Sequence, residues 1–185
     1  MQANLLCNPI PYLLRDEPEH FLRAYFNAFA VSYFPDTRMM TEHALPNIGD
    51  WRGDHYKSSD EANSTYWLRM MFIMERGEEL WLGAAIPRYW LADGKQCGIE
   101  NAGTYFGPMS VKYESRVDEG RIEMTVDPPG RNPPKRILVR FRHPRGHRMT
   151  RCKVNGKAYK RFDPVKELVV LTQCRKPTRV VAYYD

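Results

Sequence analysis

The sequence contains no apolar stretch long enough to cross a membrane as a helix. A membrane-spanning helix needs about 20 apolar residues, but the longest apolar run, Tyr66 to Met74, is interrupted by Arg69. The opening residues, Met1 to Asn4, lack the basic region and apolar core of a secretory signal. We therefore expect no membrane partner. The sequence as given predicts a cytoplasmic location, which becomes unknown if the native start lies upstream of Met1.

Cysteine motifs and glycine-rich motifs are also missing. The four cysteines are Cys7, Cys97, Cys152 and Cys174. None has CxxC spacing, which argues against a structural zinc site or a disulfide framework and predicts reduced, mostly packed thiols. There is no phosphate-cradling glycine loop, dinucleotide fingerprint or GxSxG motif. We therefore predict no cofactor.

The charge is distributed unevenly along the 185 residues. The first region, residues 1–76, carries 7 Lys and Arg against 10 Asp and Glu, whereas residues 77–185 carry 21 against 12. The corresponding net charges of −3 and +9 add up to the +6 of the whole chain. This asymmetry indicates two structural regions, and the hydrophobic content of 43% is enough for a sizeable core.

Helical spacing dominates the first region. Pro18 stands where a first helical residue is preorganised, and an amphipathic helix is expected from there to about Pro35. Its apolar positions are Phe21, Leu22, Tyr25, Phe26, Phe29 and Tyr33. A second helix is expected from Ser58, which has capping-box spacing to Glu61, to about Gly77.

The second region alternates with a period of two, which is typical of strands. Strands are expected at about 79–86, 109–116, 121–127, 135–143, 167–172 and 178–184. Asn155-Gly156 predicts a type I′ hairpin between two further strands. The expected fold is therefore α+β but mainly β: an N-terminal helical pair followed by an antiparallel β-sandwich of about eight strands.

The link between the helices, residues 35–57, holds the densest chemistry. Carboxylates beside aromatic rings suit a sugar-processing cleft, because rings stack on sugars while carboxylates bind hydroxyls or move protons. Glu42 and Asp54 are the candidate catalytic carboxylates, and Trp51 and Tyr56 are candidate substrate-binding residues.

Two other readings of the same segment are open. Asp54 could stabilise a turn after Gly53 and Trp51 could pack among helices, while Asp60 and Glu61 could simply cap the second helix. A metal site is also conceivable, because His43 and His55 stand beside carboxylates, but they have no recognised ligand spacing. We therefore predict no metal.

A basic cluster lies between residues 131 and 151, in a chain whose pI is about 9.2. Its members are Arg131, Lys135, Arg136, Arg140, Arg142, Arg145, Arg148 and Arg151. Such a cluster could neutralise phosphates, or it could be the solvated face of a strand. Because no nucleic-acid-binding motif accompanies it, nucleic acid is the less favoured partner.

Several stretches together resemble the C-terminal part of bacterial six-hairpin glycosidase-like proteins. They are Thr41-Glu42-His43, Asp60-Glu61, Trp67-Leu68-Arg69, Glu79-Leu80-Trp81-Leu82-Gly83, Pro87-Arg88-Tyr89-Trp90-Leu91, Asn101-Ala102-Gly103-Thr104-Tyr105-Phe106-Gly107, Arg142-His143-Pro144 and Val154-Asn155-Gly156-Lys157. Those proteins are similar to glycoside hydrolases with an (α/α)6 toroid followed by a β-sandwich. The resemblance implies that residues 1–76 contain the last helical hairpin of such a toroid and that 77–185 form the sandwich. It also implies that Glu42, Asp54, His43 and His55 line the rim of a sugar-binding cleft.

Three functional readings follow. The leading one is a C-terminal fragment or module of a carbohydrate-active protein. It would be catalytically incomplete alone, because some five hairpins of the toroid are missing. Its ligand would be a carbohydrate, and its partner would be either an upstream toroid region or a second copy of the chain. The alternative is a noncatalytic carbohydrate-binding or protein-interaction module with an aromatic platform. The platform residues would be Trp81, Tyr89, Trp90, Tyr105 and Phe106. The third reading is nucleic-acid binding through Arg136, Arg140 and Arg142.

Overall fold

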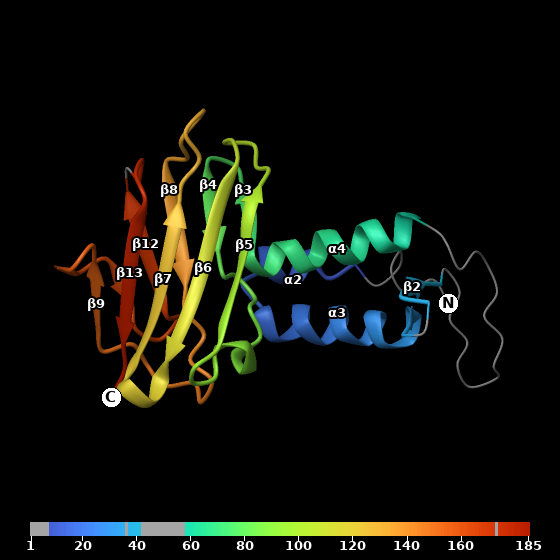
Figure 1. The fold of residues 1–185 in the computed structure, drawn as a ribbon, viewed down its shortest axis with the longest axis horizontal. Coiled ribbons are helices and arrows are strands. Elements are labelled where there is room, and N and C mark those ends of the chain that lie inside the picture. Colours follow the sequence, from blue (N-terminus) through green and yellow to red (C-terminus); the bar gives the residue numbers. More distant parts are fainter. Residues whose placement is uncertain (1–7, 36, 42–57, 173) are drawn as a thin grey trace. The chain divides into compact units, whose positions relative to one another are not determined.

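Helices make up the first part of the chain and strands the second. The computed structural model describes residues 8–35, 37–41, 58–172 and 174–185 (Figure 1). The chain divides into two compact units, Met1–Met70 and Met71–Asp185. None of the helices in the described ranges is long and apolar enough to cross a membrane.

The two predicted helices begin where the sequence signals place them, at Pro18 and Ser58, and the structure adds a short helix before them. A short helix, α2 (Ile10–Leu14), precedes α3 (Pro18–Ser32), which has Pro18 in its first turn. The buried positions of α3 recur every three to four residues, as in any amphipathic helix. They are Phe21, Leu22, Tyr25, Ala28 and Ser32. The next long helix, α4 (Ser58–Phe72), has Asp60 and Glu61 in its first turn, where carboxylates interact favourably with the helix dipole.

Both predicted helices end earlier than expected. Tyr33, placed on the helix by its spacing, instead starts β1 (Tyr33–Phe34), which pairs with β2 (Met39–Met40). Met74 belongs to β3 (Ile73–Arg76), which pairs with β4 (Glu79–Leu82) across a tight turn. Strand pairing takes over here because Gly77, at φ 59°, readily adopts the left-handed conformation that the turn requires.

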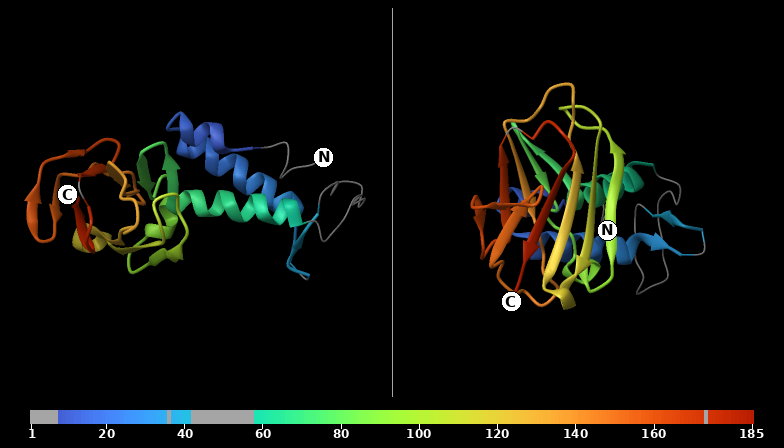
Figure 2. Two further views of the ribbon diagram at one scale, coloured as in Figure 1. Left: turned by 90° about the horizontal axis from the view of Figure 1, so that it is seen from above. Right: turned by 60° about the vertical axis from the view of Figure 1, so that its left-hand side comes forward.

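Two sheets form the second unit (Figures 1 and 2). The six-stranded sheet has the order β10-β9-β13-β7-β6-β5, and the five-stranded sheet has the order β11-β12-β8-β4-β3. The strands not yet given are β5 (Gln96–Ala102), β6 (Met109–Arg116), β7 (Arg121–Asp127), β8 (Arg136–Arg140), β9 (Arg151–Val154), β10 (Lys157–Tyr159), β11 (Phe162–Asp163), β12 (Leu168–Thr172) and β13 (Thr178–Tyr183). Short 3₁₀ turns, η2 (Arg88–Leu91) and η3 (Val117–Glu119), precede β5 and β7.

The core of this unit lies between the sheets, and alternation along the strands fills it. On β7 the side chains of Ile122, Met124 and Val126 are buried while their neighbours face outward. Tyr113 of β6 meets Phe141, just after β8, edge to face with ring centroids 5.9 Å apart. Each large apolar side chain buried in this way contributes roughly 2 kcal/mol.

The predicted fold class is confirmed: an N-terminal helical pair is followed by mainly antiparallel sheets. The Asn155-Gly156 hairpin is also as predicted, with both residues at positive φ, 48° and 80°. The sequence pattern did not show that β4 and β8 pair in parallel, because alternation predicts strands but not their partners.

Candidate functional site

A groove runs over the outward face of the six-stranded sheet, and three neighbouring strands supply its side chains. On β6 the outward residues include Lys112, Glu114 and Arg116, while the residues between them are buried. On β7 the outward residues include Arg121, Glu123, Thr125 and Asp127. The registers of β6 with β7 and of β7 with β13 bring these side chains together with Arg179.

Two hollows, of about 460 Å³ and 340 Å³, make up the groove. They share Lys112, Thr125 and Arg179, so they adjoin one another along the strands. The first, which we call the charged half, is lined by Lys112, Glu114, Arg116, Arg121, Glu123, Thr125 and Arg179. The second, the loop half, is lined by Glu100, Ser110, Val111, Lys112, Thr125, Val126, Asp127, Asn155, Pro177, Thr178 and Arg179.

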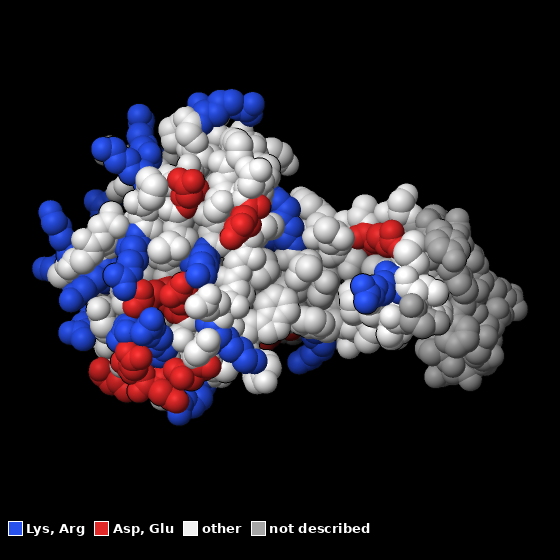
Figure 3. Space-filling view, in the orientation of Figure 1, with Lys and Arg blue, Asp and Glu red and all other residues white. Residues whose placement is uncertain are grey.

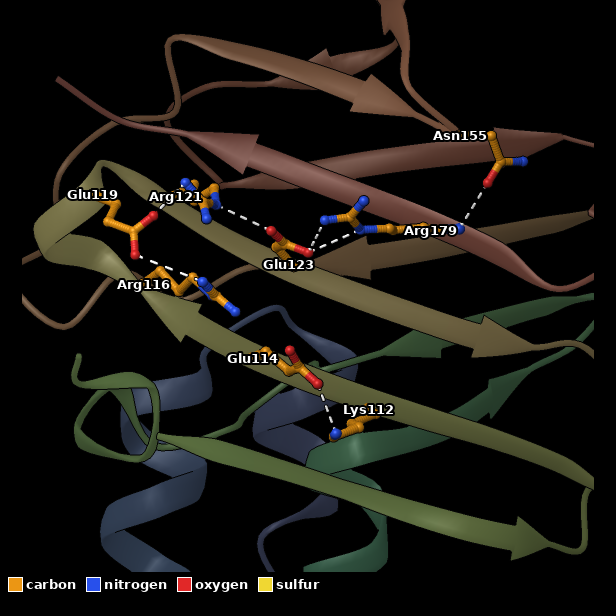
Figure 4. Close-up of polar contacts among 8 residues, drawn as sticks. All are labelled: Lys112, Glu114, Arg116, Glu119, Arg121, Glu123, Asn155 and Arg179. Atoms are coloured by element: carbon orange, nitrogen blue, oxygen red, sulfur yellow. Dashed lines mark hydrogen bonds and ion pairs between the residues drawn. The ribbon is translucent and has the colours of Figure 1, made fainter. Parts of the chain in front are cut away.

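Glu123 holds two arginines of the charged half in place (Figure 4). Its Oε1 accepts a hydrogen bond from Arg121 Nε at 3.0 Å, and its Oε2 accepts one from Arg179 Nε at 2.8 Å and another from Arg179 Nη2. Only 12% of the Glu123 side chain is exposed. Burial raises the pKa of this carboxyl, but the hydrogen bonds from Arg179 and Arg121 outweigh burial and lower it overall.

A second set of ion pairs links Glu119 to two arginines of the charged half. Glu119 accepts Arg121 Nη1 at 2.6 Å and lies 3.7 Å from Arg116 Nη1. Arg116 and Arg121 are direct cross-strand neighbours, a placement that is unfavourable for like charges. The carboxylate of Glu119 therefore screens two guanidinium groups that repel each other.

The loop half is shaped by the hairpin between β9 and β10. Asn155 Oδ1 accepts the backbone N–H of Arg179 at 2.8 Å (Figure 4), and the Asn155 N–H donates to the Arg179 carbonyl at the same distance. This two-way bond holds the hairpin against β13. Ser110 and Thr178, each with a hydroxyl that can accept or donate hydrogen bonds, complete this half with small polar groups.

The charges of the groove balance but are not mixed evenly. Four Lys and Arg and four Asp and Glu line the two hollows together. Figure 3 shows both positive and negative side chains on this face of the molecule. Glu100 and Asp127 belong to the loop half alone, whereas Arg116 and Arg121 belong to the charged half alone. The residues that line the groove therefore carry no net formal charge.

A different polar cluster is buried within the second unit and is already saturated. Glu167 Oε1 accepts the backbone N–H of His143 at 2.6 Å and the Tyr184 hydroxyl at 3.2 Å, and Oε2 accepts Arg88 Nη1 at 2.7 Å. The Glu167 side chain is only 3% exposed. Because each of its carboxylate oxygens has a partner, this cluster stabilises the fold and offers nothing to a ligand.

The structure does not test the site residues predicted from the sequence. The candidate catalytic residues Glu42 and Asp54, and the candidate substrate-binding residues, lie outside the described residues. The latter are His43, Trp51, His55 and Tyr56. Their roles, and the alternative metal site, stay predictions. Within the described ranges, no group of three or more His, Cys, Asp and Glu could hold a metal ion.

The structure removes one member, Phe106, from the predicted aromatic platform. Phe106 is only 6% exposed, whereas Tyr89 and Tyr105 are more than 70% exposed. Tyr89 lies in η2, before β5, and Tyr105 lies after it, so the two rings stand at opposite ends of a seven-residue strand. The ring of Tyr89 is covered by Lys95 Nζ, 3.4 Å from its centroid.

The arginines of the basic cluster do not all lie on a solvated strand face, as one interpretation of their alternation predicts. Arg140 and Arg142 are 5% and 2% exposed, and Arg140 Nη1 donates to the Ala84 carbonyl at 3.3 Å. Arg136, in contrast, is exposed and pairs with Glu79. Two of the three arginines named for nucleic-acid binding are therefore unavailable to a phosphate.

The cysteines that the structure describes are free thiols. They are Cys97, Cys152 and Cys174. Burial raises the pKa of Cys97 to about 11 and that of Cys152 to about 12, so both are protonated at neutral pH and poor nucleophiles. The three described cysteines are therefore reduced, as the sequence predicts.

The sequence did contain a signal for the groove. Alternation over residues 109–116 and 121–127 places one set of polar side chains outward on each strand. The alternation does not predict the order of the strands in the sheet. That order brings Arg179 beside Glu123, although 56 residues separate them in the sequence. The sequence therefore predicts the charged outward faces of the strands but not their assembly into one groove.

Comparisons with known proteins add little to this description. No protein-family model matches the chain, and no curated protein sequence matches it. Among solved structures, a chain described as a glycoside hydrolase superposes with a TM-score of 0.42 at 9% sequence identity. The superposition covers 91% of this chain and only 29% of that one. A likeness at this level supports no argument about the function of the groove.

Proposed function

We propose that this chain is a module of a carbohydrate-active protein and that the groove on its six-stranded sheet binds a glycan without catalysis. The observation that carries the proposal is an open groove whose ionised side chains are balanced in sign and, in the charged half, are held by ion pairs. Hydrogen bonds with one ionised partner are about twice as strong as neutral ones. A surface rich in such groups, already oriented by ion pairs, suits the many hydroxyls of a sugar chain.

Other ligand classes fit this groove less well. Protein interfaces are depleted of lysine, yet Lys112 lines both halves of this groove. Nucleic-acid surfaces need a cation excess to neutralise phosphates, whereas this groove is balanced. Pockets for small molecules are mostly enclosed and apolar, whereas the charged half is lined by four cations and two carboxylates.

The proposal is tested by screening the chain against a broad array of oligosaccharides and measuring affinities for those that bind. Glu123→Gln releases Arg121 and Arg179 from their shared carboxylate, so we expect it to weaken binding at least tenfold. Arg148→Ala removes an exposed arginine outside the groove and should leave affinity unchanged. The proposal is wrong if no oligosaccharide binds, or if both variants weaken binding equally.

The roles of Glu42 and Asp54 as catalytic carboxylates remain a separate proposal based on the resemblance to six-hairpin glycosidases. Noncatalytic binding by the groove does not depend on them. A Glu42→Gln, Asp54→Asn double variant is therefore expected to bind the same oligosaccharides with the same affinity. A loss of binding in this variant would place the ligand site elsewhere.

A further inference from the structure

The two halves of the groove differ in charge, and this difference bears on which glycan fits. In the charged half, four cations face two carboxylates. The loop half adds only carboxylates, Glu100 and Asp127, to the two cations that it shares. Along β7 the distance from Arg121 to Asp127 is about 20 Å, at roughly 3.3 Å per residue. A linear ligand lying along the strand would therefore meet positive charge at one end and negative charge at the other.

The pair Arg116 and Arg121 brings two positive charges together in the charged half. These residues face each other across β6 and β7, and like charges in this position destabilise a sheet unless an anion lies between them. Arg116 is the more loosely held of the two. Its side chain is 52% exposed, and its 3.7 Å ion pair is the longer of the two that Glu119 forms with these arginines.

Glu119 shows what kind of group fits between them. Its carboxylate reaches both guanidinium groups, yet 54% of its side chain is exposed. A planar carboxylate is the natural partner of a guanidinium group, which offers two parallel N–H donors. An exposed glutamate can rotate into solvent at little cost and leave this place to a carboxylate of a ligand.

From this geometry we infer that the glycan is acidic: a uronic acid residue of the ligand places its carboxylate between Arg116 and Arg121, displacing Glu119. This inference rests on the proposed function, because it names the class of sugar that the same groove binds. The neutral residues of the ligand then extend towards Asp127, where an acidic sugar would be repelled.

The experiment compares uronic acid oligosaccharides with their carboxyl-reduced counterparts. The two differ only in that the reduced form carries a hydroxymethyl group in place of the carboxylate. The ligands are oligomers of neutral sugars that carry a single terminal galacturonate, glucuronate or mannuronate residue, and the full protein chain is titrated with each of them at physiological salt. At least one acidic oligomer should bind ten or more times more tightly than its reduced form. Arg116→Ala should abolish that preference.

A variant with the opposite expected effect makes the test sharper. Glu119→Gln removes the competing carboxylate charge, so it should tighten binding of the acidic oligomer about threefold and leave the reduced form unchanged. A purely structural role of Glu119 would weaken both or neither. Arg148→Ala serves as the matched control and should change neither affinity.

The outcomes separate this inference from the proposed function. Equal affinity for acidic and reduced oligomers overturns the inference and leaves glycan binding standing. Binding of neither overturns both. A single-stranded oligonucleotide that binds more tightly than every oligosaccharide, with a steep salt dependence, would also overturn the inference, because it would make the ligand a phosphate polymer.

Discussion

Glu123 joins two strands of the groove through its carboxylate, and its ionisation therefore affects stability. Its folded pKa is lower than the ordinary value of 4.5, so the stability that it contributes is present above pH 4.5 and is lost as the pH falls through the folded pKa. Glu123→Gln should lower the free energy of unfolding at pH 7 by about 1 kcal/mol.

Denaturant titrations of both proteins between pH 7 and pH 3 measure this effect. The difference between wild type and Glu123→Gln should shrink towards pH 3. Glu114→Gln is the control, since the Glu114 side chain is 34% exposed in its ion pair with Lys112, so its loss should cost less. Equal stability of wild type and Glu123→Gln at pH 7 would show that the arginines are not held by this carboxylate.

His143 predicts a second pH effect, from the buried cluster around Glu167. Burial, with the nearby charges of His147, Arg145 and Arg88, lowers the pKa of His143 from 6.5 to about 4. The unfolded chain therefore binds a proton between pH 6.5 and pH 4 that the folded chain does not, so stability falls as the pH falls through this window.

The loss amounts to at most about 3 kcal/mol, at roughly 1.4 kcal/mol per pKa unit. His143→Gln, which cannot take up that proton, should flatten stability between pH 6.5 and pH 4. An NMR titration of the His143 ring gives the direct check. A midpoint near 6.5 in the folded protein would disprove the predicted effect.

At the scale of the element, Gly83 controls how β4 leaves the five-stranded sheet. Gly83 has φ 69°, and a Cβ placed on it would overlap the Tyr113 hydroxyl and lie 2.6 Å from the Arg140 carbonyl oxygen. Gly83→Ala should therefore destabilise the protein by about 3 kcal/mol or more, from backbone strain together with overpacking.

Gly77→Ala is the matched control for this prediction. Gly77 has φ 59°, but a Cβ there would meet nothing within 4 Å. This substitution should cost only about 1 kcal/mol, from the left-handed conformation alone. Thermal unfolding of both variants gives the comparison. Equal destabilisation would show that the space around Gly83 is not the limiting factor.

How much of these elements the sequence predicts depends on whether the signal is local. The strand β7 was predictable because Ile122, Met124 and Val126 alternate with polar residues, and the β9–β10 turn because Asn155-Gly156 favours positive φ. The start of β3 was not predictable, because Ile73 and Met74 continue the apolar spacing of α4. Only pairing with β4 decides this boundary.

The same distinction explains the candidate site. Local alternation predicts that Arg121 and Glu123 face outward. The same reasoning fails for the predicted strand at 135–143, where Arg140 and Arg142 are buried. Arg140 finds a partner in the Ala84 carbonyl, in a distant part of the sequence. Long-range partners, not residue type, decide whether an arginine belongs to a groove or to the interior.

For the molecule as a whole, the division into two compact units predicts that the sandwich folds independently. Residues 71–185 contain both sheets and the whole groove. Expressed alone, this segment should unfold cooperatively on heating and bind the same oligosaccharides as the full chain within about threefold. A segment that shows no cooperative transition by circular dichroism would mean that the sandwich depends on the first unit.

The central claim, that the groove of the six-stranded sheet is the glycan site, is tested most directly by NMR chemical-shift mapping. The full chain is titrated with the oligosaccharide that binds best, and the shifted backbone amides are assigned. The account predicts that the largest shifts fall on β6, β7 and β13, centred on Lys112, Thr125 and Arg179. Shifts confined to the surroundings of Tyr89 or Tyr105, or no shifts at saturating ligand, would contradict it.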